Sequence, residues 1–526
     1  MRILTASDRA LLVEAADLDE AMRWNLALAD VPGIVERVPG ARTVLVRYDP
    51  LRTSAGALAA VLETMTADAE HLTLVREVVV PVIYDGADLE EAAGLLAVSP
   101  EELVRRHLAA QWRVAFSGFA PGFGYAVSDD PLFDVPRRSS PRTRVPAGSV
   151  GLAGPFTGVY PRETPGGWQL IGRTDAEMWD IDRDPPALLS PGTLVRFERA
   201  VAPPVVASEN RDDPDSDPRV AEEHAAVATK DPRSPSGGIE IVRPPLQMLV
   251  QDAGRPGHAA LGVSSSGAAD RTALRDANRA VGNASTAAVL ECVGSAVLRF
   301  QASGVAVVTG AVGELEVTTG AGEIRSIAHG RPFATSDGDE LHLGHPERGI
   351  RYVIGVRGGV AAASALGSRS ADTLAGLGPA PLVGGDVVAI GGDVVGAVDD
   401  LVVPRVLPAP GELVELAITL GPRDDWFTPA ALRVLTEQDW LVSPRSDRVG
   451  VRLHGDRGLE RAIEGELPSE GAVTGAIQVP PDGQPVLFLP DHPLTGGYPI
   501  IGALTDHALD IAGQMPPGAR VRFRIV

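Results

Sequence analysis

The sequence predicts a mainly β protein that has an α/β N-terminal part and carries one β module in each half. The segment Thr164–Gly172, TPGGWQLIG, returns as Leu494–Gly502, LTGGYPIIG. Two flanking pairs repeat in the same order, Pro146–Val150 with Ser469–Val473 and Pro191–Phe197 with Pro517–Phe523. Turns of Pro-Gly and Gly-Gly recur in any β-rich chain, but three collinear matches favour the duplication of a module.

The first 80 residues alternate short strands and helices. Apolar periodicity and capping residues predict strand, helix, strand, strand, helix and strand, over 10–14, 17–29, 33–38, 43–48, 54–65 and 77–83. The two middle strands form a hairpin about Pro39-Gly40. This β-α-β-β-α-β order is typical of the split βαβ, or ferredoxin-like, fold, which hosts many functions and decides none of them.

The rest of the chain is rich in turns and β-structure. Ser99-Pro-Glu-Glu102 marks a helix start, and from Trp112 to Arg199 glycines and prolines punctuate short strands, as in a barrel or sandwich. After an acidic, apolar-poor stretch the second half is again β-rich, with one helix over 269–281. We therefore expect an α/β domain over 1–80, a β domain over 81–202, a flexible acidic linker over 203–236, and two β domains over 237–403 and 404–526.

Composition and charge exclude several classes of protein. The net charge of −22 argues against nucleic acid and anionic membrane as partners, because both bind clustered positive charge. No apolar run approaches the roughly 18 residues of a membrane span, and Met1–Asp8 lacks the apolar stretch of a signal peptide. Cys292 is the only cysteine, which excludes an internal disulfide and a Cys-based zinc site. We expect a cytoplasmic protein that binds no metal through its own side chains.

Lysine is almost absent. Lys230 is the only one among 47 basic residues, and it lies in the expected linker. The chain therefore lacks a phosphate-binding Gly-x-x-x-x-Gly-Lys-Ser/Thr loop, a lysine for Ser-Lys amidase chemistry and a lysine in a packed domain to carry biotin. Anionic ligands must be held by arginine or by backbone N–H groups.

Two kinds of segment could bind a ligand. In Phe116–Tyr125 glycines alternate with aromatic residues, so that N–H groups can approach a ligand flanked by rings; a packed β-bulge is the alternative. The preceding His107 is a candidate base, although a structural histidine is the simpler interpretation. In the second half, Asp-Arg pairs beside turns suit a carboxylate or phosphate, with surface ion pairs as the alternative. Asp491-His492 is not expected to form a dyad, because neighbours on a strand point to opposite faces.

These motifs resemble a known family. The first half is similar to the B subunit of bacterial 5-oxoprolinase, the KipI family, through Ser117–Phe123, Val145–Gly151 and Thr164–Thr174. The second half resembles the C subunit, the KipA family, through segments that include Val250–Gly257, Ser266–Arg271, Leu366–Arg369, Gly421–Phe427, Ser446–Arg448 and Gly496–Pro499. Both halves are also similar to the carboxyltransferase region of urea carboxylase, and such chains are often labelled allophanate hydrolase subunits. The resemblance implies cyclophilin-like β-barrels, one in each half, with a ferredoxin-like domain in front of the first.

The resemblance also implies a function. The implied reaction is the ATP-dependent opening of 5-oxo-L-proline to glutamate. The implied partner is a separate protein, the A subunit of 5-oxoprolinase, and ATP and Mg²⁺ are bound in the complex with it. No biotin is attached to this chain, and a homo-oligomer is compatible with the sequence. The resemblance and the Asp-Arg pairs together assign catalytic roles to Asp270, Arg271, Arg423, Asp424, Asp447 and Arg448. Substrate-binding roles fall to Ser117, Gly118, Phe119, Pro121, Gly122, Pro146, Gly148, Ser149, Gly166, Gly167, Trp168, Glu470, Gln478, Gly496, Gly497 and Tyr498. We expect these loops to line one cleft in each half.

Other functions remain open. Pro493-Leu494 departs from the Gln-Thr that many members carry before Thr-Gly-Gly-Tyr-Pro, which leaves the substrate undecided. A urea-carboxylase-type carboxyltransferase would need biotin-carrier and biotin-carboxylase partners. A KipI-like regulator of a histidine kinase would explain the first half and leave the second half unexplained. The amidase implied by the allophanate hydrolase label is the weakest candidate, because its Ser-Lys chemistry lacks a lysine.

Overall fold

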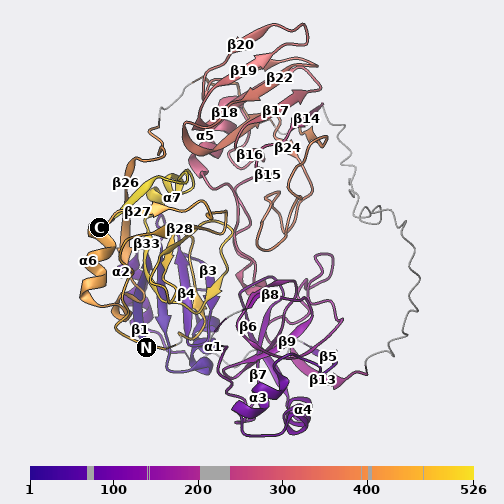
Figure 1. The fold of residues 1–526 in the computed structure, drawn as a ribbon, viewed down its shortest axis with the longest axis vertical. Coiled ribbons are helices and arrows are strands. Elements are labelled where there is room, and N and C mark those ends of the chain that lie inside the picture. Colours follow the sequence, from indigo (N-terminus) through magenta and orange to yellow (C-terminus); the bar gives the residue numbers. More distant parts are fainter. Residues whose placement is uncertain are drawn as a thin grey trace.

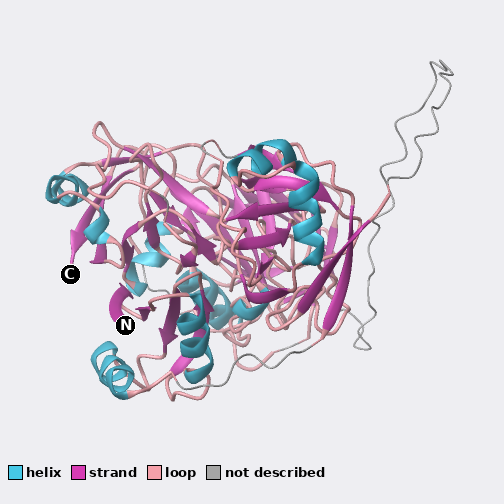
Figure 2. Ribbon diagram, turned by 90° about the horizontal axis from the view of Figure 1, so that it is seen from below, coloured by secondary structure: helices cyan, strands magenta, loops and turns pink. Residues whose placement is uncertain are grey.

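A computed structural model of the chain describes residues 1–67, 76–138, 140, 142–201, 237–392, 394–400, 405–465 and 467–526. The expected linker over 203–236, with Lys230, lies outside the described residues, as does the expected domain boundary at 403–404. The described chain is mainly β and forms four bodies: an N-terminal α/β body, two barrels and a body of two packed sheets (Figures 1 and 2). The predicted fold class is confirmed.

The N-terminal body is a four-stranded antiparallel sheet with two helices on one face. Its elements are β1 (Arg2–Ser7), β2 (Ala10–Glu14), α1 (Leu18–Ala27), β3 (Ile34–Pro39), β4 (Thr43–Tyr48) and α2 (Ala55–Thr64), in the sheet order β1-β2-β4-β3. Asp17 and Ser54 cap the helices, as predicted. Along β2 the side chains alternate: Leu11 and Val13 pack toward the helices, while Ala10 and Leu12 face the opposite side.

One strand of the expected ferredoxin-like order is placed differently. The strand predicted at 77–83 forms as β5 (Glu77–Val82), but it pairs in parallel with β13 (Leu194–Arg199) in the first barrel. The N-terminal sheet is completed instead by β1, which pairs with its chain neighbour β2. The apolar pattern identified β5 as a strand, but the pairing partner lies over a hundred residues away and leaves no local signal.

The first barrel follows. It contains β5, α3 (Leu89–Leu95), α4 (Pro100–Ala109), β6 (Trp112–Ser117), β7 (Gly124–Val127), β8 (Arg142–Val145), β9 (Ser149–Ala153), β10 (Phe156–Val159), β11 (Thr164–Gly166), β12 (Gln169–Arg173) and β13. Seven strands run in the order β12-β9-β10-β7-β6-β13-β5, and a bridge between Ile83 and Arg173 joins the two edges. His107, on α4, is fully buried between the Tyr84 hydroxyl (2.8 Å) and the Thr157 hydroxyl (3.0 Å), which is the structural role considered for it.

The second barrel has the same topology. It contains β26 (Leu413–Leu420), η2 (Asp424–Trp426), α6 (Pro429–Glu437), β27 (Trp440–Val442), β28 (Gly450–His454), β29 (Glu470–Gly471), β30 (Ala476–Gln478), β31 (Val486–Phe488), β32 (Thr495–Gly496), β33 (Ile500–Leu504), α7 (Asp506–Ala512) and β34 (Arg520–Ile525). The closed order is β26-β33-β30-β31-β28-β27-β34, and β29 pairs with β32 as β8 pairs with β11. Matching β5–β13 with β26–β34 in chain order reproduces every neighbour, which confirms the predicted duplication.

Backbone hydrogen bonds fix the register of the two copies. Gly192 N–H donates to Val114 O, and Gly518 N–H donates to Val442 O, so the downstream sequence match is confirmed. The Gly-Gly pairs begin at the ends of the equivalent strands β11 and β32.

The upstream match is wrong by four residues. Gly148 N–H donates to Tyr160 O just as Gly475 N–H donates to Phe488 O. The Gly148 carbonyl accepts from Thr174 N–H, directly after β12, and the Gly475 carbonyl accepts from Leu504 N–H, at the end of the equivalent strand β33. Gly148 is therefore equivalent to Gly475 and not to Gly471. Both glycines have a positive φ, 78° and 88°, and precede a strand directly. The connection between β29 and β30 has one residue more than that between β8 and β9, and the short motif matched Gly148 to a glycine on β29 instead of the one before β30.

The remaining body, at the top of Figure 1, is a sandwich of two sheets around one core. One sheet has the order β20-β19-β22-β17-β14-β25-β24 and the other β15-β16-β23-β18-β21. Their strands are β14 (Gly238–Arg243), β15 (Gln247–Gln251), β16 (Val289–Val293), β17 (Ala296–Phe300), β18 (Gly304–Val312), β19 (Leu315–Thr318), β20 (Ile324–Ser326), β21 (Phe333–Thr335), β22 (Glu340–Leu343), β23 (Arg348–Val356), β24 (Val360–Ala361) and β25 (Val387–Ile390). The predicted helix is α5 (Arg271–Val281), capped by Asp270, and it packs on β18 and β23; η1 (Ala259–Leu261) precedes it.

The two halves are interleaved. The face of the N-terminal sheet away from its helices packs on the second barrel, so that Leu12, Val38 and Leu45 share an apolar cluster with Phe488 and Ile500. In Figure 1 the indigo sheet lies against the orange and yellow barrel. Burial of these side chains joins residues near position 10 to residues near position 500 and creates the junction described next.

Candidate functional site

A cavity of about 270 Å³ lies where three bodies meet. The N-terminal sheet, the segment before α5 and the second barrel each contribute to its wall. The lining residues are Ser7, Asp8, Arg9, Glu36, Val38, Arg47, Ala253, Pro256, Ser265–Ala269, Arg271, Ala472–Thr474, Leu489, Pro490, His492, Leu494, Leu504, Asp506 and Leu509. Sites at the junctions of domains are a common place for small ligands.

Arginine–carboxylate pairs surround the cavity. Arg9 pairs with Asp506 at 2.7 Å, and Arg47 pairs with Glu36 at 2.5 Å. Arg271, the first residue of α5, pairs with Asp506 at 2.7 Å and also binds Asp510. Each positive charge thus has a negative partner, and the rim carries little net charge.

His492 is the one imidazole of the lining. Its side chain is 5% exposed, and its Nδ1 lies 2.9 Å from the Pro493 carbonyl oxygen. A carbonyl oxygen only accepts, so Nδ1 carries the proton and Nε2 has a free lone pair. Burial lowers the pKa of His492 to about 4, and the charge of Arg47 adds to this effect, so the ring is neutral at pH 7. Nε2 has no hydrogen-bond partner among the described residues.

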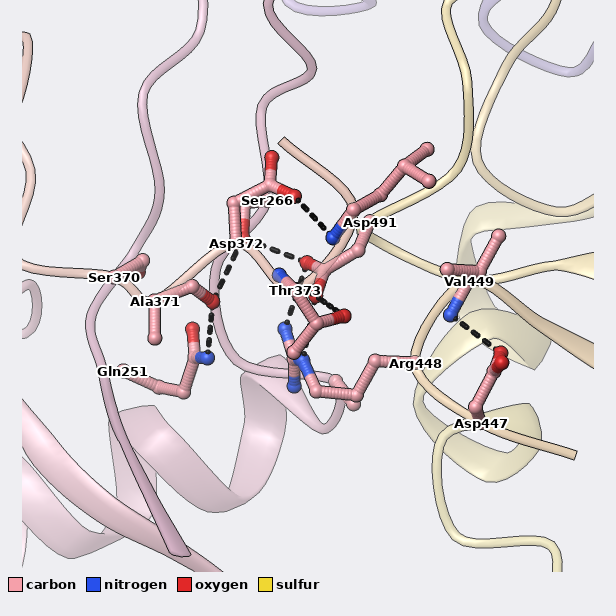
Figure 3. Close-up of polar contacts among 12 residues, drawn as sticks. Gln251, Ser266, Ser370, Ala371, Asp372, Thr373, Asp447, Arg448, Val449 and Asp491 are labelled. Carbon is pink, nitrogen blue, oxygen red and sulfur yellow. Dashed lines mark hydrogen bonds and ion pairs between the residues drawn. The ribbon is translucent and has the colours of Figure 1, made fainter. Parts of the chain in front are cut away.

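A buried polar network supports the wall of the cavity (Figure 3). Ser266, with φ of 50°, donates its hydroxyl to Asp491 Oδ1 at 2.7 Å. Arg448 Nε donates to Asp491 Oδ2 at 3.0 Å, Arg448 also donates to the Gly267 carbonyl at 2.6 Å, and it pairs with Glu291. Asp491 therefore faces this network while His492 faces the cavity, in agreement with the expectation that they form no dyad.

The charges of this network depend on each other. Burial acts to raise the pKa of Asp491, but the Arg448 guanidinium outweighs it and holds that pKa below the ordinary value. Asp372 accepts from the Ser264 hydroxyl at 2.8 Å and forms no ion pair among the described residues, and the charge of Arg255 only partly offsets its burial. Burial, together with the charge of Asp491, raises the pKa of Asp372 to about 6.

The predicted catalytic residues are mostly held in structural ion pairs. Asp270 caps α5 and pairs with Arg405 at 2.8 Å, and Arg423 bridges Glu14 and Glu470, both at 2.7 Å. Asp447 accepts from the N–H groups of Val449 and Gly450, and Asp424 begins η2. Of these six residues only Arg271 lines the cavity, and Arg448 lies directly behind it. Their catalytic roles stay predictions.

The predicted substrate loops of the two halves meet each other. Phe119 N–H donates to the Thr495 hydroxyl at 3.0 Å, so the Ser117–Gly122 loop contacts the Gly-Gly loop of the second barrel. Glu470 pairs with Gly496 on β29 and β32, and a Cβ on Gly496 would lie 2.5 Å from Gln478 Nε2. The two loop sets therefore touch at the interface between the halves, and their roles in substrate binding stay predictions.

The other first-half residues lie in turns and in the barrel core. The Ser149 hydroxyl donates to Pro146 O at 2.8 Å, and Trp168 is buried with its ring centroid 5.1 Å from that of Phe123. A Cβ on Gly166 would lie 2.3 Å from the Tyr160 hydroxyl. Gly497 closely approaches Arg137, which lines a second cavity of about 460 Å³ together with Arg42, Pro468 and Ser469.

Sequence reasoning missed Arg9, Glu36 and Arg47 as cavity residues. They belong to the N-terminal sheet, and no motif marks them. The signal that could have identified them is a charged residue on an otherwise apolar strand, as at Arg47 within TVLVRY, but surface strands show the same pattern.

The comparisons with known proteins agree with the architecture. The family model described as carboxyltransferase domain, subdomain C and D, matches residues 1–189, and the model of subdomain A and B matches residues 261–525. The chain belongs to the carboxyltransferase-domain family. It joins the two modules in one polypeptide, with the C and D module first.

Its relatives include separate subunits of one enzyme. The first half is 43% identical over 182 residues to the 5-oxoprolinase B subunit of Escherichia coli O157:H7, which covers 33% of this chain and 83% of that protein. The second half is 32% identical over 289 residues to the 5-oxoprolinase C subunit of Escherichia coli strain K12, covering 54% of this chain and 90% of that protein. A urea amidolyase of Lachancea kluyveri is 28% identical over 312 residues, covering 54% of this chain and only 17% of its own length.

A solved structure matches almost the whole chain. The crystal structure of TTHA0988 superposes with a TM-score of 0.78 and 31% identity, and covers 98% of this chain and 100% of that one. The urea carboxylase structure from Kluyveromyces lactis superposes with a TM-score of 0.50 and 26% identity over 56% of this chain and 27% of that one. Among the described residues, no helix has the length and apolar character required to cross a membrane.

Proposed function

We propose that this chain is the fused B and C component of an ATP-dependent 5-oxoprolinase, which opens 5-oxo-L-proline to glutamate together with a separate A subunit. One observation carries the proposal. The two halves match proteins named as the B and C subunits of 5-oxoprolinase over 83% and 90% of their lengths, whereas the match to urea amidolyase covers 17% of that protein. A chain whose two halves resemble two subunits of one enzyme is best explained as a component of such an enzyme.

The cavity described above does not fit Mg²⁺-ATP. A triphosphate needs several positive charges, whereas Arg9, Arg47 and Arg271 are each paired with a carboxylate. Within the described parts of the chain, no group of three or more His, Cys, Asp or Glu side chains is arranged to hold a metal ion. We therefore assign no step of ATP chemistry to this cavity and propose that ATP is bound in the complex with the A subunit.

The proposed function is tested by adding the partner. Purified chain is assayed for ATP-dependent release of glutamate from 5-oxo-L-proline, first alone and then with the A subunit of a 5-oxoprolinase. We expect little activity from the chain alone and full activity with the partner. Full activity of the chain alone, or none with any such partner, contradicts the proposal.

A carboxyltransferase is the second candidate, and the family models favour it, since both describe carboxyltransferase subdomains. Such an enzyme would accept a carboxyl group from biotin carried by another protein. Transfer from carboxybiotin to urea, measured without the A subunit, is the outcome that would establish it. In the same preparation the two candidates therefore give different products.

A further inference from the structure

We propose that the three-body cavity binds a small carboxylic acid with a neighbouring N–H group, as in a cyclic amide acid, with His492 Nε2 accepting the N–H and Arg47 or Arg9 binding the carboxylate. The identification of 5-oxo-L-proline as the natural ligand rests on the proposed function. The class of ligand rests on the following features of the cavity.

The acceptor is His492 Nε2. The ring is nine-tenths buried, lines the cavity and is fixed by two contacts: Nδ1 donates to the Pro493 carbonyl, and the ring stacks on Phe488 with centroids 5.4 Å apart and planes at 8°. Because the tautomer is fixed and the ring is neutral, Nε2 can only accept a hydrogen bond. Because His492 lines the cavity and Nε2 has no partner among the described residues, a ligand N–H group can donate a hydrogen bond to Nε2.

The carboxylate site is formed by arginines of the N-terminal sheet. Arg47 binds Glu36 through NH1, and Arg9 binds Asp506 through NH2, which leaves other N–H groups of each guanidinium without a partner among the described residues. Arg47 and His492 both line the cavity, so a ligand in it can contact both side chains. Asp8, Glu36 and Asp506 balance Arg9, Arg47 and Arg271, so the rim has no excess positive charge for a polyphosphate, and a single carboxylate would be held by hydrogen bonds from one guanidinium.

The size and the walls of the cavity favour a small ring. Its volume of about 270 Å³ lies just below the range of roughly 300–1,000 Å³ that is typical of pockets for drug-sized ligands. Val38, Leu489 and Leu494 give it apolar walls, against which ring methylene groups can pack. The walls come from both halves, because Arg47 and Val38 precede the linker and His492 and Leu494 follow it.

Binding is measured by isothermal titration calorimetry with three probes: 5-oxo-L-proline, its lactone analogue 5-oxotetrahydrofuran-2-carboxylate, and 2-pyrrolidinone. The lactone lacks only the N–H, and pyrrolidinone lacks only the carboxylate. We expect 5-oxo-L-proline to bind at least tenfold more tightly than either analogue. Equal affinity for the lactam and the lactone, or no binding of 5-oxo-L-proline at millimolar concentration, overturns the proposal.

Substitutions test which side chain binds the N–H group of the ligand and which binds its carboxylate. His492→Leu should weaken binding of 5-oxo-L-proline at least tenfold and leave the weak binding of the lactone unchanged, while Arg47→Gln should weaken both acids and leave pyrrolidinone unchanged. The matched controls are His454→Leu and Arg52→Gln, which change exposed residues outside the cavity and should bind like the wild type. A loss for the lactone equal to that for the lactam in His492→Leu would contradict the role of Nε2.

Two further outcomes are distinguishable. If His492→Leu does not fold, as judged by thermal melting, the Arg47→Gln arm and the analogue series on the wild type still decide the matter. If the three probes behave as expected but no A subunit restores turnover, the binding site stands and the proposed function fails. If His492→Leu leaves turnover with that partner unchanged, the proposed function stands and the proposed binding site fails.

Discussion

Arg448 and Asp491 form an ion pair in which both side chains are fully buried, with Nε and Oδ2 3.0 Å apart. Arg448 lies in the loop between β27 and β28, which is equivalent to the Ser117–Phe123 loop of the first barrel. Its guanidinium also pairs with Glu291 on β16 and so connects the second barrel to the two-sheet body. This connection holds the segment that contains Ser266 in place against the cavity.

Removing the charge of Arg448 should destabilise the protein strongly. In Arg448→Met, Asp491 would stay buried without its cation and Glu291 would keep only Arg351, 3.5 Å away; breaking one side of a buried pair costs about 3–5 kcal/mol. The free energy of unfolding is measured with urea. Arg445→Met, an exposed change in the same loop, should change it by less than about 0.5 kcal/mol. A similar loss in both variants would show that the buried pair has no special role.

Asp372 predicts a pH dependence of stability. Its folded pKa of about 6 lies above the ordinary value of 3.8, so between these values the folded protein holds a proton that the unfolded chain has lost. Stability therefore falls as the pH rises from about 4 to about 6, by up to roughly 3 kcal/mol from this group. Asp372→Asn should remove this fall.

The comparison of variants isolates Asp372. The buried histidines His107 and His492, with pKa values lowered to about 3 and about 4, contribute in the opposite direction, since their stability is lost on acidification. Their contributions cancel when Asp372→Asn and the wild type are compared at each pH. The exposed Asp337→Asn is the control, and an unchanged pH profile in Asp372→Asn would refute the assignment.

The two halves should stay together when the linker is cut. The apolar cluster between the N-terminal sheet and the second barrel, and Arg423 between Glu14 and Glu470, do not depend on a covalent connection. With a protease site inserted within the expected linker, 203–236, the cleaved wild type should elute as one species in gel filtration. Gly471→Glu should separate the halves, because a Cβ there would lie 2.7 Å from Leu45 Cβ.

Gly392→Glu is the control for this experiment. Apart from its chain neighbours, no atom of the described residues lies within 4 Å of a Cβ at that position, so the cleaved variant should elute like the wild type. Separation of the cleaved wild type would mean that the interface between the halves is too weak to hold without the linker.

Local signals in the sequence predicted local structure well. Asp17 and Ser99 cap α1 and α4 as expected, since a side-chain oxygen before an apolar periodic segment satisfies the first free N–H groups of a helix. The repeat predicted two barrels of one topology, because turn glycines such as Gly192 and Gly518 recur where the backbone needs φ above zero.

Long-range relationships were not predictable in the same way. The cavity joins Arg47 to His492, which are separated by more than 400 residues, and neither lies in a repeated motif. Arg423 and Arg448 were predicted to suit a carboxylate or a phosphate of a ligand. In the structure they bind carboxylates of the same chain, those of Glu14, Glu470, Glu291 and Asp491. The sequence indicates that an arginine can bind a carboxylate, but it does not show whether that carboxylate belongs to a ligand or to another part of the chain.

The duplication makes a last prediction about matched tryptophans. Trp112 Nε1 donates to the His107 carbonyl and Trp440 Nε1 to the Leu435 carbonyl, both at 3.0 Å, and both rings are fully buried. Each bond ties the strand after the helix back to the end of that helix. Trp112→Phe and Trp440→Phe each leave a buried carbonyl without its donor, which costs about 1–3 kcal/mol, in addition to the loss of packed volume.

We therefore expect similar losses in the free energy of unfolding from the two variants, measured with urea. Trp426→Phe is the control, because that half-buried indole makes no hydrogen bond among the described residues and its replacement should cost less. If only one of the two barrel variants is destabilised, the duplicated helix–strand contact supports one barrel and not the other. Equal losses would show that both copies have kept the stabilising helix–strand hydrogen bond although their sequences have diverged.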